Sequence, residues 1–171
     1  MNHTRNSSSD RALRALRLVV GAALFLVAAS CSAGSPPGAV TAGDPWKAPQ
    51  LIRPAELAAL LADSTKQKPM LLHVGFKPLF RAGAIPGSIY VGPGSRPDGI
   101  TALKAAVKGV PRDRAIVVYC GCCPWDHCPN MRPAFKTLRD LGFKNAKAMV
   151  ITKNLDDDWV AKGYPIEKPS Q

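Results

Sequence analysis

Short apolar segments alternate with segments of helical periodicity along most of this chain. Residues 70–74, 85–91, 114–119 and 146–151 are predicted strands, and residues 53–62, 101–107 and 133–141 are predicted helices. The strongest strand pattern is Ile116–Tyr119, which is wholly β-branched or aromatic and is typical of a central strand covered on both faces. This alternation predicts an α/β domain with a mainly parallel sheet flanked by helices. In such sheets ligands bind beyond the carboxyl ends of the strands.

The first 49 residues follow a different pattern. Arg11, Arg14 and Arg17 precede an apolar run at residues 18–29, which is shorter than the about 20 residues needed to span a bilayer. Small residues before Cys31 resemble the bacterial lipoprotein signal, in which such a cysteine is lipidated. We therefore predict a signal peptide at 1–30, a lipidated Cys31 with a tether rich in Pro, Gly and Ser at 31–49, and a folded domain at 50–168. A cleaved secretory signal with an incidental Cys31 and a transmembrane anchor are the alternatives.

Each of these interpretations implies an exported protein, periplasmic or on the cell surface, whose thiols face an oxidising compartment. The net charge of +11 falls to +8 when Arg5, Asp10 and the three arginines of the leader are set aside. The remaining Lys and Arg residues are scattered and no nucleic-acid-binding motif accompanies them, so we expect no nucleic-acid partner. A basic surface favours a small anionic substrate or an anionic membrane.

Four cysteines lie within nine residues, directly after the strongest strand: Cys120, Cys122, Cys123 and Cys128. A thiol at a strand-to-helix turn meets converging N–H groups and a helix dipole, which lower its pKa and favour the reactive thiolate. We expect Cys120 to be the most acidic thiol because it alone is fixed to the strand end, and we expect the next helix to begin between Pro129 and Pro133. Cys123, at C-x-x-C spacing from Cys120, is the predicted resolving thiol.

Other arrangements of the same cluster remain open. A disulfide of Cys120 with Cys123 is the bridge that we favour, a Cys123–Cys128 bridge is the alternative, and closure of Cys122 with Cys123 is disfavoured by ring strain. The four cysteines together with His127 could instead bind a soft metal ion such as Zn²⁺ or Cu⁺. His127 and Arg132 could also lower the thiol pKa values through their positive charge. His73 is expected to be a buried strand residue that hydrogen-bonds to the backbone.

In order and spacing, five short pieces of residues 51–168 resemble a rhodanese-like domain. They are Leu-Leu-His-Val-Gly at 71–75, Phe-Arg-Ala-Gly-Ala-Ile-Pro-Gly-Ser-Ile at 80–89, Val-Val-Tyr-Cys at 117–120, Leu-Arg-Asp-Leu-Gly-Phe at 138–143 and Trp-Val-Ala-Lys-Gly-Tyr-Pro at 159–165. The resemblance implies a parallel five-stranded sheet flanked by helices and a nucleophilic cysteine after the central strand, matched by Cys120, that carries sulfane sulfur as a persulfide. This chain departs from the family in having His73 and Gly75 where an acidic residue and an arginine are usual. Its active loop is also longer by several residues.

Together these features predict a rhodanese-like sulfurtransferase or thiol-redox protein with Cys120 and Cys123 as catalytic residues. Gly121, Cys122 and Arg132 are the predicted binding residues for a small sulfur-containing anion, with a thiol as acceptor, and no cofactor is expected. Two alternatives remain open. One is a non-enzymatic metal-binding or sensing module, and the other is an inactive rhodanese fold whose loop is stapled by a disulfide.

Overall fold

The structure is a computed structural model in which residues 43–169 are described. The predicted signal peptide, Cys31 and most of the predicted tether lie outside these residues. The strands are β1 (Leu51–Ile52), β2 (Met70–His73), β3 (Ser88–Tyr90), β4 (Ile116–Tyr119) and β5 (Ala146–Met149). The helices are α1 (Pro54–Ala62), α2 (Lys77–Ala82), α3 (Pro97–Ala106), α4 (Met131–Asp140) and α5 (Leu155–Asp158), with 3-10 turns at Ala48–Gln50 and Val160–Lys162.

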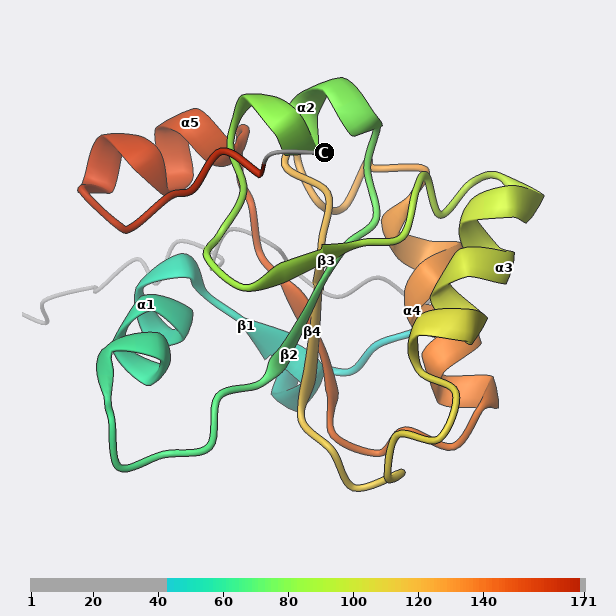
Figure 1. The fold of residues 1–171 in the computed structure, drawn as a ribbon. Helices are drawn as coiled ribbons and strands as arrows, with labels where there is room; N and C mark the ends of the chain where they lie inside the picture. Colours follow the sequence, from blue (N-terminus) through green and yellow to red (C-terminus); the bar gives the residue numbers. More distant parts are fainter. Residues whose placement is uncertain (1–42, 170–171) are drawn as a thin grey trace, which may run out of the picture. The chain divides into compact units, whose positions relative to one another are not determined.

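The five strands form one parallel sheet in the order β1-β5-β4-β2-β3 (Figure 1). β4 lies at its centre and pairs with β2 on one side and β5 on the other, so Val118 is level with Leu72 and Ala148. All four residues of β4 are buried. The fold class and the central position of the Ile116–Tyr119 strand are therefore confirmed.

Alternate residues of β4 serve two separate hydrophobic cores. Val118 packs in a cluster that includes residues of α3 and α4, whereas Val117 packs in a second cluster with residues of α1 and α5. Figure 1 shows α3 and α4 together on one side of the sheet and α1 on the other. Burial on both faces explains why this strand reads as a continuous apolar run instead of an alternating one.

The ends of the helices follow from local chemistry. Pro54 opens α1, where its missing N–H is not needed, and the Glu56 carboxylate accepts the N–H of Arg53 at 3.1 Å. α4 begins at Met131, within the predicted interval between Pro129 and Pro133. α2 and α5 were not predicted, because six and four residues are too few to display a helical period.

The packed domain extends further toward the N-terminus than the predicted boundary at residue 50. Trp46 is 1% exposed, and its ring centroid lies 4.8 Å from that of Trp125 and 5.5 Å from that of Phe135. The composition of residues 31–49 suggested a tether, but a single large aromatic residue within it is enough to add this segment to the core. Within residues 43–169, no helix is both long enough and apolar enough to cross a membrane.

Candidate functional site

Cys120 is the first residue after β4, at the carboxyl edge of the sheet, and it is 2% exposed. The loop that follows is tied to the C-terminal part of the domain by two backbone hydrogen bonds. Leu155 N–H donates to the Gly121 carbonyl at 3.0 Å, and Trp125 N–H donates to the Ile151 carbonyl at 2.8 Å. Gly121 has a φ of +85°, a conformation that glycine adopts without strain. Gly121, predicted to bind substrate, thus has a conformational role in this turn.

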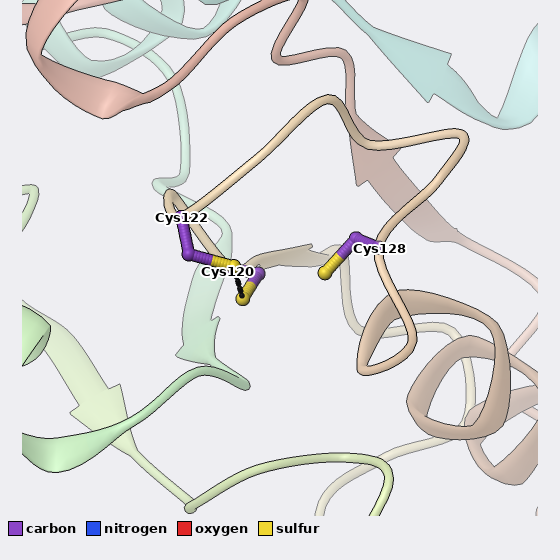
Figure 2. Close-up of side chains that lie close together, drawn as sticks. All are labelled: Cys120, Cys122 and Cys128. Carbon is purple, nitrogen blue, oxygen red and sulfur yellow. Dashed lines mark hydrogen bonds between the residues drawn. The ribbon is translucent and has the colours of Figure 1, made fainter.

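The sulfur atoms of Cys120, Cys122 and Cys128 all lie within 4.8 Å of one another. Figure 2 shows the three side chains converging from the start and the end of the loop. The Cys120 and Cys122 sulfurs are 3.2 Å apart. Cys123 contacts Cys122, also at 3.2 Å, and is not a member of the three-sulfur group. All four cysteines are free thiols in this structure, so the favoured Cys120–Cys123 bridge is not formed here.

Asn130 contributes a polar contact that the sequence did not suggest. Its side-chain oxygen accepts hydrogen bonds from the Ser95 backbone N–H at 3.1 Å and the Ser95 hydroxyl at 2.8 Å. This pairing orients the amide so that its nitrogen donates to the Cys120 sulfur at 3.4 Å. Asn130 is completely buried, so the contact is shielded from water.

These neighbours lower the pKa of Cys120 to about 6, because hydrogen bonds from Cys128, Asn130 and Cys122 stabilise the thiolate more than burial penalises it. The pKa of Cys128 is raised, chiefly by its hydrogen bond to Cys120 and then by burial. The pKa of Cys122 is raised chiefly by burial. The cluster therefore holds one thiolate, on Cys120, with two neighbouring thiols as donors. Cys120 is more acidic than Cys122 and Cys128, as the sequence predicted.

The side of Cys120 that faces β2 is closed by His73 and Gly75. A Cβ atom on Gly75 would lie 2.9 Å from the Cys120 sulfur, the Cys120 carbonyl oxygen and the His73 ring, so only glycine fits at this position. His73 is 1% exposed, and its Nδ1 accepts the Gly75 N–H at 3.3 Å. Burial lowers the pKa of His73 to about 4, so it is neutral at pH 7. The prediction of a buried, backbone-bonded His73 is confirmed.

A cavity of about 220 Å³ reaches Cys120 from outside. Its lining residues are His73, Leu79, Ala82, Gly83, Cys120, Gly121, Leu155, Asp156, Val160, Ile166 and Lys168. Apart from the Cys120 thiolate, the charged residues among its described lining are Lys168 and Asp156, and both are exposed. A larger apolar cavity of about 780 Å³ lies between α1 and the segment at 159–165, and its described lining contains no cysteine.

Two predicted site residues have other partners. The Arg132 guanidinium binds the fully buried Asp44 carboxylate, at 2.6 Å from Nη2 and 2.9 Å from Nε. The Arg132 charge is thus paired within the protein, and the ion pair holds the segment 43–50 against α4. The His127 side chain is 81% exposed and pairs with Asp126 at 3.0 Å, outside the three-sulfur group.

Sequence reasoning missed Asn130, Ser95 and Lys168 as parts of the site. Asn130 stands at the N-cap position of α4, but its side chain makes no capping hydrogen bond and donates to the Cys120 sulfur instead. Ser95 and Lys168 are 25 residues before and 48 residues after Cys120 in the chain, and only the fold brings them to this edge.

No family model and no curated protein matches this sequence. Solved structures do match. The crystal structure of the Alr3790 protein from Anabaena sp. is 19% identical with a TM-score of 0.53, over 70% of this chain and 83% of that one. The solution structure of the rhodanese-like domain of the same protein is 21% identical with a TM-score of 0.51, over 70% and 80%. The Saccharomyces cerevisiae single-domain sulfurtransferase is 19% identical with a TM-score of 0.50, over 68% and 93%. At these identities the likeness shows the fold, which is rhodanese-like.

Proposed function

We propose that this protein carries sulfane sulfur on Cys120, as a sulfurtransferase or thiol-redox protein. The observation that carries the proposal is the environment of this thiol. It is fixed at the carboxyl end of the central strand, and Cys128, Asn130 and Cys122 stabilise its thiolate. A thiolate at pH 7 is the reactive form of cysteine. The fold, which is shared with a solved sulfurtransferase, supports the same conclusion.

The reaction would proceed in two displacements. The Cys120 thiolate attacks the outer sulfur of thiosulfate, a new S–S bond forms on Cys120, and sulfite leaves with the electron pair of the broken S–S bond. An acceptor such as cyanide then attacks the terminal sulfur of the persulfide, which releases thiocyanate and restores the Cys120 thiolate. No electrons are exchanged with an outside redox partner, and the protein needs no cofactor for this cycle.

The described residues supply distinct functions in this scheme. The 220 Å³ cavity admits a small anion to Cys120, and Lys168 at its rim takes the charge-binding role that the sequence assigned to Arg132. The Asn130 amide and the two neighbouring thiols hold the negative charge on sulfur. Cys122, whose sulfur lies 3.2 Å from that of Cys120, is placed to resolve a persulfide. Its attack on the Cys120 sulfur would form a Cys120–Cys122 disulfide and release hydrosulfide, and an external dithiol would then reduce this bridge.

The test is transfer from thiosulfate to cyanide, followed as thiocyanate, by the full chain and single Cys→Ser variants. We expect Cys120→Ser to abolish transfer and Cys128→Ser to reduce it, because the second variant removes a thiol donor from the nucleophile. Mass spectrometry should find the added sulfur on the peptide that contains Cys120. Full transfer by Cys120→Ser together with its loss in Cys123→Ser would move the nucleophile to Cys123.

For the location of the protein, we propose export and lipid anchoring at Cys31. The support is the sequence alone: Arg11, Arg14 and Arg17, the apolar run at 18–29 and the small residues before the cysteine. Acyl chains contribute about 0.8 kcal/mol per buried CH₂, so two of them hold a domain stably on a membrane. Cys31→Ser should release the protein from the membrane fraction or block its maturation. An unchanged mass and an unchanged membrane fraction would exclude lipidation at this residue.

A further inference from the structure

The three-sulfur group has a property that sulfur transfer does not require. One thiolate with a hydrogen-bond donor is enough for a persulfide carrier, yet three cysteine sulfurs point to a common centre within 4.8 Å of one another. Cys120 and Cys128 are buried and Cys122 is half-buried, so the centre is largely screened from water. Preformed, shielded sets of soft sulfur ligands select thiophilic metal ions.

We propose that Cys120, Cys122 and Cys128 form a three-thiolate site for a soft monovalent metal ion, of which Cu⁺ is the representative. The inference does not rest on the proposed sulfur transfer, although both use Cys120. An ion held by Cys120 occupies its sulfur lone pairs, so ion binding and persulfide formation exclude each other.

The geometry fits such an ion after a small adjustment. With metal–sulfur distances of about 2.3 Å, three sulfurs arranged around one ion lie about 4 Å apart. The three sulfurs are within 4.8 Å of one another, and the Cys120 and Cys122 sulfurs are 3.2 Å apart. This pair must therefore open by less than 1 Å. Cys122 can supply that movement because it is half-buried, whereas Cys120 and Cys128 are buried.

Among residues 43–169, no fourth ligand belongs to the three-sulfur group, which favours a three-coordinate monovalent ion over Zn²⁺. His127 is turned to solvent and paired with Asp126. The Asn130 nitrogen is a donor without a lone pair for a metal, and its oxygen is engaged by Ser95. Cys123 contacts Cys122 and stays outside the group. Structural zinc sites are almost always four-coordinate, so Zn²⁺ would lack a protein ligand here.

The experiment is an anaerobic titration of the full chain, reduced beforehand and kept in mild detergent, against a coloured Cu⁺ chelator. We expect one Cu⁺ per chain and an X-ray absorption spectrum with three sulfur neighbours at about 2.3 Å. Cys122→Ser and Cys128→Ser should each weaken binding by more than the roughly 10- to 100-fold typical of losing an outer-sphere partner. Cys123→Ser is the matched control from the same loop and should bind Cu⁺ like the unaltered protein.

Several results would overturn the site. These are no competition with the chelator, an equal loss in Cys123→Ser and Cys128→Ser, nitrogen or oxygen neighbours in the absorption spectrum, or displacement of Cu⁺ by equimolar Zn²⁺. If a serine variant fails to fold by circular dichroism, the absorption spectrum of the unaltered protein decides the ligand count. Sulfur transfer is measured separately on metal-free protein, so its absence would reject the proposed function and leave the metal site standing.

Discussion

At the scale of single residues, the reactivity of Cys120 depends on contacts made by side chains that are themselves held in place. Ser95 fixes the Asn130 amide, and that amide donates to the Cys120 sulfur. A hydrogen bond to a charged group stabilises it by about 1.5–3 kcal/mol. Asn130 therefore stabilises the Cys120 thiolate, and replacing Asn130 should raise the pKa of that thiol.

We expect Asn130→Ala to raise the pH midpoint of Cys120 alkylation by roughly one unit, because the thiolate loses a charge-assisted donor. The unaltered protein should show a midpoint near pH 6, as the pKa of Cys120 is lowered to about 6 by Cys128, Asn130 and Cys122. Iodoacetamide rates across pH, read on the Cys120 peptide, provide the measurement. Asn145→Ala is the control, since Asn145 donates to the Asp113 carbonyl on the exposed surface. Equal midpoints in the two variants would show that the Asn130 contact does not act on the thiol.

Gly75 gives a second residue-scale prediction. A Cβ at this position would lie 2.9 Å from the Cys120 sulfur and from its backbone oxygen, which cannot both move away. We expect Gly75→Ala to cost about 1–3 kcal/mol of folding stability, as overpacked sites do, and to slow Cys120 alkylation by displacing the sulfur. Urea unfolding and the alkylation rate measure the two effects. Gly43→Ala, with no atom near its Cβ direction, should change neither. Normal stability and reactivity of Gly75→Ala would contradict the close approach.

At the scale of elements, β2 ends in a buried titratable side chain, the imidazole of His73. His73 lies at the end of β2, and its ring centroid is 5.3 Å from that of Phe80 and 5.1 Å from that of Tyr119. An apolar cage of this kind disfavours the imidazolium, and burial lowers the pKa of His73 from 6.5 to about 4. His73 therefore becomes protonated near pH 6.5 in the unfolded chain but only near pH 4 in the folded protein.

The free energy of unfolding should therefore decrease as the pH is lowered. The folded pKa is depressed, so the contribution of His73 is fully present above pH 6.5 and is lost as the pH falls toward 4, by about 3 kcal/mol. Urea unfolding at pH 7, 5.5 and 4 gives the slope. The lowered pKa of Cys120 also makes the folded protein more stable as the pH rises. The difference in pH slope between the unaltered protein and His73→Gln therefore isolates the contribution of the histidine. An identical pH slope in His73→Gln would show that this ring does not contribute.

At the scale of the whole molecule, the segment before β1 closes the core around the cysteine loop. Trp46 packs on Trp125 of the loop and on Phe135 of α4, and the Asp44–Arg132 ion pair holds the segment against the same helix. The loop with its three converging sulfurs is therefore supported from one side by residues that precede the sheet in sequence. Loss of this support should weaken the fold and loosen the site together.

We expect Trp46→Ala to lower the free energy of unfolding by about 3–5 kcal/mol, the usual cost of removing a buried tryptophan. Urea denaturation of the full chain is the measurement, and Lys47→Ala, altered at an exposed neighbouring position, is the control. The same variant should also increase the reactivity of Cys128 toward a thiol reagent, because Trp125 loses its packing partner. If Trp46→Ala unfolds like Lys47→Ala, residues 43–49 are not part of the folded core.

The sequence by itself determined the α/β class, the parallel sheet, the central buried strand and Cys120 at its carboxyl end. These features depend on local patterns: a β-branched apolar run can be satisfied only by burial on both faces, and a residue that follows such a strand must lie at the sheet edge. The start of α4 between Pro129 and Pro133 was predictable for the same reason. Only the tertiary structure decided which cysteines meet, because the path of a long loop depends on anchors such as Trp125 to Ile151 and Gly121 to Leu155. It likewise brought Asn130, Gly75 and Lys168 to the thiol and paired Arg132 with Asp44, since contacts between residues distant in sequence leave no periodic signal in the chain.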